Sequence, residues 1–197
     1  MPALLGAEVV GLDLSQPLGQ GTIARLRAAF LKRSVLLWRG QDLSKSRQVD
    51  LCRLFGEPVP HPTNTRDRDE EVPEICIIAN VQKNGRAVGA LANDEVAFHA
   101  DLVFLHEPGA VSMLYCLETP AAGGDTWWTS GYAAYAALDQ AIKARLEGLK
   151  AVYRHRRPEY NPPVAAAHPL VCTHPESGRR TLFVSPGAAR GIEGMEE

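Results

Sequence analysis

The residues of this sequence whose types and spacing could perform chemistry are His99 and Asp101, which lie two positions apart. If the segment is extended, side chains at i and i+2 point to the same face, so the imidazole and the carboxylate can converge on one ion. One His and one carboxylate are two of the three ligands of a 2-His-1-carboxylate triad, which holds non-haem iron(II) with open coordination positions. The pair alone is a weak signal, because a surface His beside a capping Asp gives the same letters.

A second candidate, Thr126, follows the paired glycines Gly123 and Gly124. The glycines permit a tight turn or a close approach of backbone to a ligand, and the threonine hydroxyl can donate a hydrogen bond to a ligand carboxylate. The alternative interpretation is an ordinary hairpin loop before a helix that Ser130 caps.

Several ordered motifs together carry a resemblance that no single motif carries. They are Phe98-His99-Ala100-Asp101, Glu118-Thr119-Pro120, Gly123-Gly124-Asp125-Thr126, Ser130-Gly131-Tyr132, Gly6-Ala7-Glu8-Val9, Phe55-Gly56-Glu57-Pro58 and His168-Pro169-Leu170-Val171. In this order the sequence resembles the taurine and 2,4-dichlorophenoxyacetate dioxygenase (TauD/TfdA) family, over nearly its whole length.

The resemblance implies an iron(II) enzyme on a double-stranded β-helix, or jelly roll. Such an enzyme uses 2-oxoglutarate and dioxygen to oxidise a small, often acidic, organic molecule, with release of succinate and CO2. It implies that His99 and Asp101 bind iron and act in catalysis, and that Thr126 helps to hold the distal carboxylate of 2-oxoglutarate.

Two further residues are expected beside the substrate by the same resemblance. Glu95 stands four residues before His99, at a position that is often a polar substrate contact in the family, and Leu102 follows Asp101. An acid at position 95 would repel a sulfonate or a carboxylate, which argues against taurine itself. His168 and His174 are expected to make structural hydrogen bonds rather than to bind the metal.

The second iron-binding His and the Arg that pairs with 2-oxoglutarate are expected beyond Glu197. Residues 1–197 are therefore predicted to form one dioxygenase domain that lacks its C-terminal portion. One alternative is a non-catalytic family member that binds metal weakly and self-associates through an open sheet edge. A zinc hydrolase is a further alternative, but no helical His-Glu motif supplies the general base that it would need.

The elements that must position these residues follow from periodicity and from turn residues. Helices are predicted over residues 22–33, 44–55, 130–138 and 139–149. Strands are predicted over residues 35–38, 75–79, 110–117, 150–153 and 181–184, and four prolines indicate that residues 158–169 are irregular. The fold class is therefore mainly β with decorating helices, an antiparallel barrel or sandwich.

Composition narrows the choice of partner and of compartment. The 197 residues are 45% hydrophobic and carry a net charge of -2, which favours a small-molecule substrate over nucleic acid or an acidic membrane. No apolar run approaches the roughly 20 residues that cross a bilayer. The four cysteines form no C-x-x-C pair, so we expect reduced thiols in a cytoplasmic protein, with a homo-oligomer left open.

Overall fold

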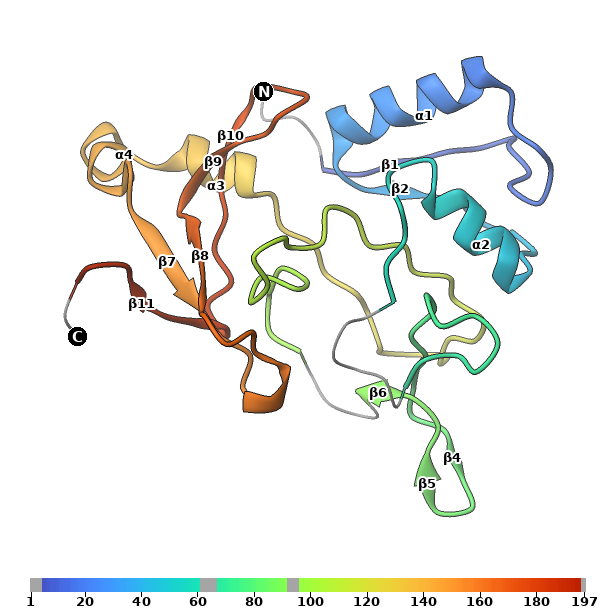
Figure 1. Ribbon diagram of the computed structural model, residues 1–197. Coiled ribbons are helices and arrows are strands. Elements are labelled where there is room, and N and C mark those ends of the chain that lie inside the picture. Colours follow the sequence, from blue (N-terminus) through green and yellow to red (C-terminus); the bar gives the residue numbers. More distant parts are fainter. Residues whose placement is uncertain (1–4, 61–66, 92–95, 196–197) are drawn as a thin grey trace.

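The computed structural model describes residues 5–60, 67–91 and 96–195, and most of its elements form two groups, between which the chain is irregular or forms only short strands (Figure 1). One group holds helices α1 (Gln20–Arg33) and α2 (Lys45–Cys52) with strands β1 (Ala7–Glu8) and β2 (Leu36–Leu37). The other holds helices α3 (Gly131–Ala137) and α4 (Gln140–Leu146), the 3-10 turn η1 (Pro158–Tyr160) and strands β7 (Lys150–Tyr153), β8 (Ala166–Pro169), β9 (Val171–Thr173), β10 (Arg180–Leu182) and β11 (Ala189–Ile192). The prediction of a mainly-β fold with a few helices is confirmed.

The N-terminal group forms around a small apolar core. Strands β1 and β2 pair in parallel, and Ser44 caps α2 as predicted, because its hydroxyl accepts from the Arg47 backbone N–H. Helix α2 ends at Cys52, three residues before the predicted end. The buried residues Leu14, Leu43 and Leu51, with partly buried Met113 and Tyr115 packed against them, are named here the N-terminal core.

The C-terminal group is built on a three-stranded antiparallel sheet in the order β11, β7, β8. Strands β9 and β10 form a separate antiparallel pair. The buried residues Val103, Phe104, Ala151, Tyr153 and Leu170 are named here the C-terminal core. Two of these core residues directly follow the His99 to Asp101 segment, so the C-terminal core supports the candidate site.

Helices α3 and α4 begin where the sequence predicts. The Ser130 hydroxyl accepts from the Ala133 N–H, and the Asp139 carboxylate accepts from the Ile142 N–H. Gly131 lies so close to β10 that a Cβ at this position would collide with the Leu182 carbonyl. A glycine is therefore required where α3 crosses β10.

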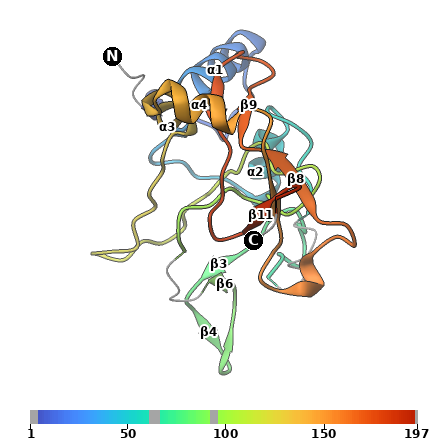
Figure 2. The ribbon, with the colours of Figure 1, turned by 90° about the vertical axis from the view of Figure 1, so that its left-hand side faces the viewer.

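The middle of the chain contains short strands. These are β3 (Ile78–Ala79), β4 (Gln82–Lys83), β5 (Arg86–Ala87) and β6 (Ala90–Leu91). The predicted strand over 75–79 is reduced to β3 and one bridge between Arg68 and Cys76. The β4–β5 hairpin projects from the rest of the molecule in both views (Figures 1 and 2). Among the described residues, no helix has the length and apolar character that a membrane span requires.

Two predictions about regular structure are wrong. Residues 110–117 are assigned to no strand, because no described segment pairs with their backbone, although Met113 and Tyr115 alternate inward as strand residues do. Residues 158–169 contain η1 and β8, because Pro158 stands at the start of the 3-10 turn and Pro169 at the end of β8. Strand β11 has no counterpart in the prediction.

A buried carboxylate ties the loop after residue 66 to α2. Asp69 is 8% exposed, and its Oδ2 lies 2.7 Å from Lys45 Nζ. Its Oδ1 accepts from the backbone N–H groups of Glu71 and Val72, at 3.1 and 3.0 Å. The hydrogen bond from Lys45, followed by those from the backbone, holds the pKa of Asp69 below its ordinary value.

We expect the contribution of the Asp69 carboxylate to the free energy of unfolding to be lost in acid. Because the folded-state pKa is depressed, the stabilisation is present above the unfolded-state pKa of about 3.9 and is lost as the pH falls through the lower folded-state value. Urea unfolding of Asp69→Asn should therefore show a smaller loss of stability between pH 7 and pH 3 than the wild type. Asp50→Asn, which removes a carboxylate from an exposed ion pair with Arg53, is the matched control. Equal pH dependence in wild type and Asp69→Asn would contradict this prediction.

Candidate metal centre

The structure brings His99 and Asp101 together. His99 Nε2 lies 3.1 Å from Asp101 Oδ1, and the two side chains are 49% and 51% exposed. The segment is irregular rather than a strand, with a bend at Phe98 and a turn that begins at Asp101. The i and i+2 side chains nevertheless converge, as the spacing predicts.

The hydrogen bond on the other ring nitrogen fixes the tautomer of His99. Nδ1 lies 2.9 Å from the Ala97 carbonyl oxygen, and a carbonyl can only accept, so Nδ1 carries the hydrogen and donates it. In the neutral ring Nε2 then holds a lone pair, which faces a carboxylate oxygen that also has only lone pairs. The two atoms are compatible at this distance when a cation is shared between them, either a proton on Nε2 or a metal ion. One imidazole nitrogen and one carboxylate oxygen are a donor set that suits a divalent transition metal.

Leu102 gives the turn after Asp101 its shape. Its φ of 54° lies in the left-handed region, which is uncommon for a residue that is not glycine. Its carbonyl accepts from the Leu105 N–H at 2.9 Å, and its side chain packs against the C-terminal core. Backbone strain of this kind gathers at functional sites. A substrate contact by Leu102 stays a prediction.

His168 hydrogen-bonds to the backbone of the same turn. Its Nε2 lies 3.0 Å from the Val103 carbonyl oxygen and 2.9 Å from the Leu105 carbonyl oxygen, so the N–H is shared between two acceptors. Its ring packs between those of Tyr153 and Phe183, with centroid distances of 5.7 and 5.6 Å. His168 therefore has the structural role expected of it.

His174 has a different structural role. Its Nδ1 accepts from the backbone N–H groups of Glu176 and Ser177, both at 3.3 Å, within the turn that joins β9 to β10. The expectation of structural hydrogen bonding is confirmed here too. In the described ranges 5–60, 67–91 and 96–195, no group of three His, Cys, Asp or Glu residues is arranged to hold a metal ion.

Thr126 lies in the irregular chain before α3. Gly123 and Gly124 have φ of 78° and 73°, which glycine adopts without strain, and the chain bends just before them, at residues 121–122. Thr126 is exposed, and within the described part of the chain its hydroxyl makes no hydrogen bond, including none to His99 or Asp101. The hydroxyl is thus available to a ligand. Glu95 lies outside the described residues.

Two serines that local sequence patterns do not reveal contact the segment from His99 to Asp101. The Ser112 hydroxyl donates to Asp101 Oδ2, and Ser185 Oγ accepts from the Ala100 N–H at 3.3 Å. Ser185 is 1% exposed. The serines are 11 and 85 residues from their partners, so no local spacing could have identified them.

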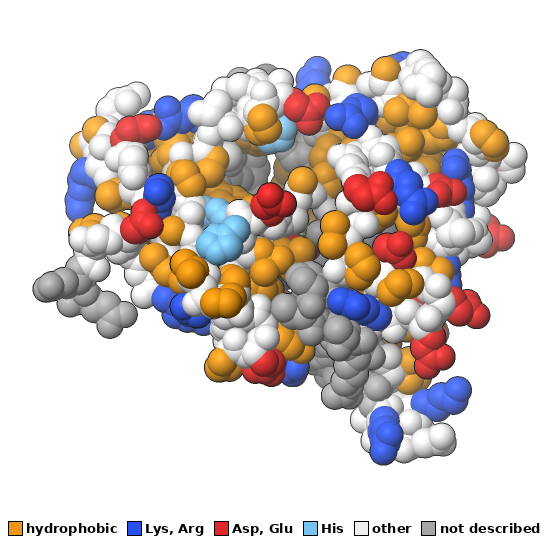
Figure 3. Space-filling model, viewed as in Figure 1, with side chains coloured by type: hydrophobic (Ala, Val, Ile, Leu, Met, Phe, Trp, Pro, Cys, Tyr) orange, Lys and Arg blue, Asp and Glu red, His pale blue; other side chains and the backbone are white. Residues whose placement is uncertain are grey.

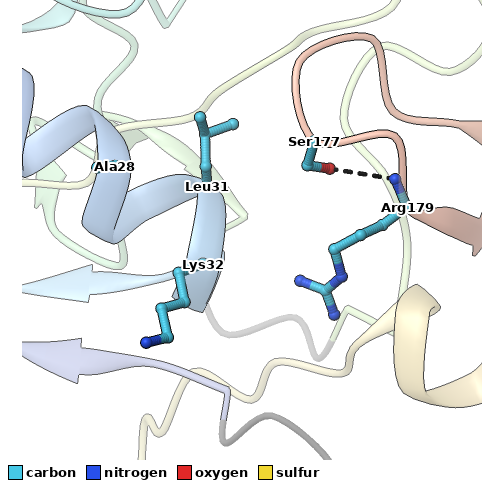
Figure 4. A pocket seen from close by; sticks show the side chains of 5 residues that line it. All are labelled: Ala28, Leu31, Lys32, Ser177 and Arg179. Atoms are coloured by element: carbon cyan, nitrogen blue, oxygen red, sulfur yellow. Dashed lines mark hydrogen bonds between the residues drawn. The ribbon is translucent and has the colours of Figure 1, made fainter.

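Two other features of the surface, a set of exposed hydrophobic side chains and a cleft, do not include His99 or Asp101. Hydrophobic side chains are spread over the middle of the face that Figure 3 shows. Over the described residues, the exposed large hydrophobic side chains include Leu114, Leu117 and Trp127, at 61%, 86% and 76%. A cleft lies between α1 and the β9–β10 turn, where Leu31 and Lys32 face Ser177 and Arg179 (Figure 4). It contains neither His99 nor Asp101.

Comparison with known proteins gives one consistent group. A family model described as "Taurine catabolism dioxygenase TauD, TfdA family" matches residues 1–197. An alpha-ketoglutarate-dependent sulfate ester dioxygenase of Pseudomonas putida is 31% identical in an alignment of 198 positions, gaps included, that covers 90% of this chain and 62% of that protein. The alpha-ketoglutarate-dependent 2,4-dichlorophenoxyacetate dioxygenase of Cupriavidus pinatubonensis is 32% identical in an alignment of 216 positions, gaps included, that covers 98% of this chain and 74% of that protein. Alpha-ketoglutarate is another name for 2-oxoglutarate.

Solved structures agree with the sequence matches. A taurine dioxygenase from Burkholderia xenovorans superposes with a TM-score of 0.75 at 31% identity, over 98% of this chain and 64% of that one. The chain spans about half to three quarters of the length of the curated relatives that it matches, from 51% to 74%.

Proposed function

Because the chain belongs to the taurine catabolism dioxygenase TauD, TfdA family, we propose that it is an iron(II)- and 2-oxoglutarate-dependent dioxygenase. It would hydroxylate a small organic substrate and release succinate and CO2. The observation that carries the proposal is the arrangement of His99 and Asp101, in which two lone-pair donors 3.1 Å apart face one another on an exposed turn.

Each residue of the site has a distinct proposed role. His99 Nε2 and Asp101 Oδ1 hold iron(II), while the Ala97 carbonyl keeps the imidazole in the tautomer that leaves Nε2 free. Bound iron(II) would bind and activate dioxygen, and 2-oxoglutarate would supply two electrons as it is decarboxylated. Thr126 donates a hydrogen bond to the distal carboxylate of 2-oxoglutarate. The third metal ligand and the arginine that pairs with 2-oxoglutarate are expected outside the described residues.

The proposed substrate is a small organic acid or ester, with Leu102 beside it. Two of the relatives are a sulfate ester dioxygenase and a 2,4-dichlorophenoxyacetate dioxygenase. Glu95 is proposed near the same substrate, where its negative charge would disfavour an anionic group on that side. A panel of sulfonates, sulfate esters, phenoxyacetates and neutral analogues separates these classes.

The proposed fold is a double-stranded β-helix in a single domain spanning residues 1–197. The antiparallel β11–β7–β8 sheet, the β9–β10 pair and the TM-score of 0.75 support it. A single domain should unfold in one transition when far-UV and near-UV circular dichroism are followed together. Two separate transitions would contradict the single-domain proposal.

Turnover tests the proposed reaction directly. The protein is incubated with iron(II), 2-oxoglutarate, dioxygen and each member of the panel, and succinate is measured. We expect succinate only when iron, dioxygen and an accepted substrate are all present. Weak metal binding without succinate for any substrate would favour the non-catalytic alternative.

We expect Thr126→Val to raise the concentration of 2-oxoglutarate needed for half-maximal turnover about ten- to a hundredfold. One lost hydrogen bond to a charged carboxylate is worth roughly 1.5 to 3 kcal/mol. Turnover at saturating 2-oxoglutarate should change little, since the hydroxyl contacts no reacting atom. Thr129→Val, an exposed threonine three residues further on, is the control. If Thr126→Val gave the wild-type titration curve, Thr126 would belong to an ordinary turn.

A cytoplasmic location and self-association are also proposed. The unpaired segment 110–117, with Leu114 and Leu117 exposed, offers an edge and apolar surface for contact between two copies. Size-exclusion chromatography over a range of concentrations tests association, and cell fractionation tests location.

A further inference from the structure

We propose that Ser112 is a positioning residue for the Asp101 carboxylate. The inference rests on the proposed metal-binding role of Asp101. The Ser112 hydroxyl donates to Oδ2, and this leaves Oδ1 directed at His99 Nε2, 3.1 Å away. Ser112 thus selects which carboxylate oxygen is presented to the metal ion.

Ser112 can do this because its own segment is fixed. Tyr115, three residues further on, packs against the N-terminal core. Its hydroxyl accepts from the Leu43 N–H and donates to the Gln41 carbonyl, both at 3.1 Å. In an extended chain alternate side chains point in opposite directions, so Met113 and Tyr115 face the core and Ser112 faces away from it. The N-terminal core therefore determines where the Ser112 hydroxyl lies.

The two segments are close enough for a direct and specific contact. A Cβ on Gly109 would lie 3.8 Å from the Asp101 carbonyl oxygen and 3.9 Å from Asp101 Cβ, so the chain at 109–112 runs alongside the turn at Asp101. Among the described residues, Ser112 is the one hydrogen-bond donor to Oδ2. Without that donor the half-exposed carboxylate is free to rotate about its Cβ–Cγ bond, and Oδ1 loses its fixed direction.

Because Ser112 and Asp101 are both exposed, a positioning role of Ser112 can be distinguished from a role in packing. Ser112 is exposed and its partner Asp101 is 51% exposed, so removal of the hydroxyl leaves no cavity and no buried unpaired group. The folded state should barely change. The affinity for the metal should change, since groups that hydrogen-bond to metal ligands typically alter affinity by about 10- to 100-fold.

Binding of manganese(II) to the metal-free protein tests the inference, with free manganese(II) measured by electron paramagnetic resonance. We expect Ser112→Ala to weaken binding about tenfold and Ser112→Thr, which keeps the hydroxyl, to bind nearly as the wild type does. Asp101→Ala is the reference for loss of the ligand itself. The thermal unfolding midpoint of each metal-free variant, which a structural role of Ser112 would lower, should stay at the wild-type value.

The outcomes separate failure of this inference from failure of the proposed function. If Asp101→Ala loses manganese(II) while Ser112→Ala binds as the wild type does, Ser112 does not position the carboxylate. The positioning role is equally excluded if Ser112→Thr loses as much affinity as Ser112→Ala with unchanged unfolding midpoints. If Asp101→Ala binds manganese(II) as tightly as the wild type does, the metal centre itself is wrongly assigned.

Discussion

We expect His99→Ala and Asp101→Ala each to reduce substrate-dependent succinate formation to background while leaving the protein folded. Each change removes one of the two proposed iron ligands, whose side chains the structure brings together, and the remaining one should hold iron(II) poorly. Both side chains are about half exposed, at 49% and 51%, and neither belongs to the C-terminal core. Succinate is measured with iron(II), 2-oxoglutarate and an accepted substrate, and circular dichroism reports the fold.

Matched controls come from the same region of the chain. His106→Ala and Asp125→Ala remove an exposed histidine and an exposed aspartate that are not among the hydrogen-bond partners of His99 and Asp101 in the described residues, so turnover should stay near the wild-type rate. If either His99→Ala or Asp101→Ala turned over at the wild-type rate, the metal centre would have to lie elsewhere. Loss of the circular dichroism signal would instead show that the pair is needed for folding.

The features predicted correctly from the sequence depend on neighbours within a few positions. The caps Ser44, Ser130 and Asp139 each accept a backbone N–H three residues ahead, as the local spacing dictates. The convergence of His99 and Asp101 follows from the same kind of argument. Helix α2 ends at Cys52 rather than at residue 55, because the next bonds run from Leu54 and Phe55 to carbonyls three residues back, as 3-10-type turns.

The features that were missed depend on partners distant in the sequence. Residues 110–117 have the composition of a strand, but a strand exists only where another segment pairs with it. Strand β8 forms in a proline-rich stretch because β7 supplies its ladder, from Tyr153 opposite Ala166 to Lys150 opposite Pro169. Ser112 and Ser185 contact the segment from His99 to Asp101 only because the chain folds. A pattern among residues that are close in the sequence does not reveal contacts between distant segments.

His168 is a histidine whose expected structural role is confirmed by its contacts with the Val103 and Leu105 carbonyls. We expect His168→Ala to lower the free energy of unfolding by roughly 2 to 4 kcal/mol. Two effects add: the Val103 and Leu105 carbonyls lose their shared donor, and a gap opens between the rings of Tyr153 and Phe183. The difference is measured by urea unfolding of the metal-free protein.

A graded series distinguishes the two effects and tests the structural role. His168→Gln keeps N–H donors but not the ring, so it should recover part of the lost stability, while the exposed His106→Ala should unfold as the wild type does. Because Val103 and Leu105 lie in the turn that begins at Asp101, His168→Ala should also weaken manganese(II) binding. Wild-type stability of the metal-free His168→Ala protein, combined with complete loss of manganese(II) binding, would contradict this view and would mark His168 as a metal ligand.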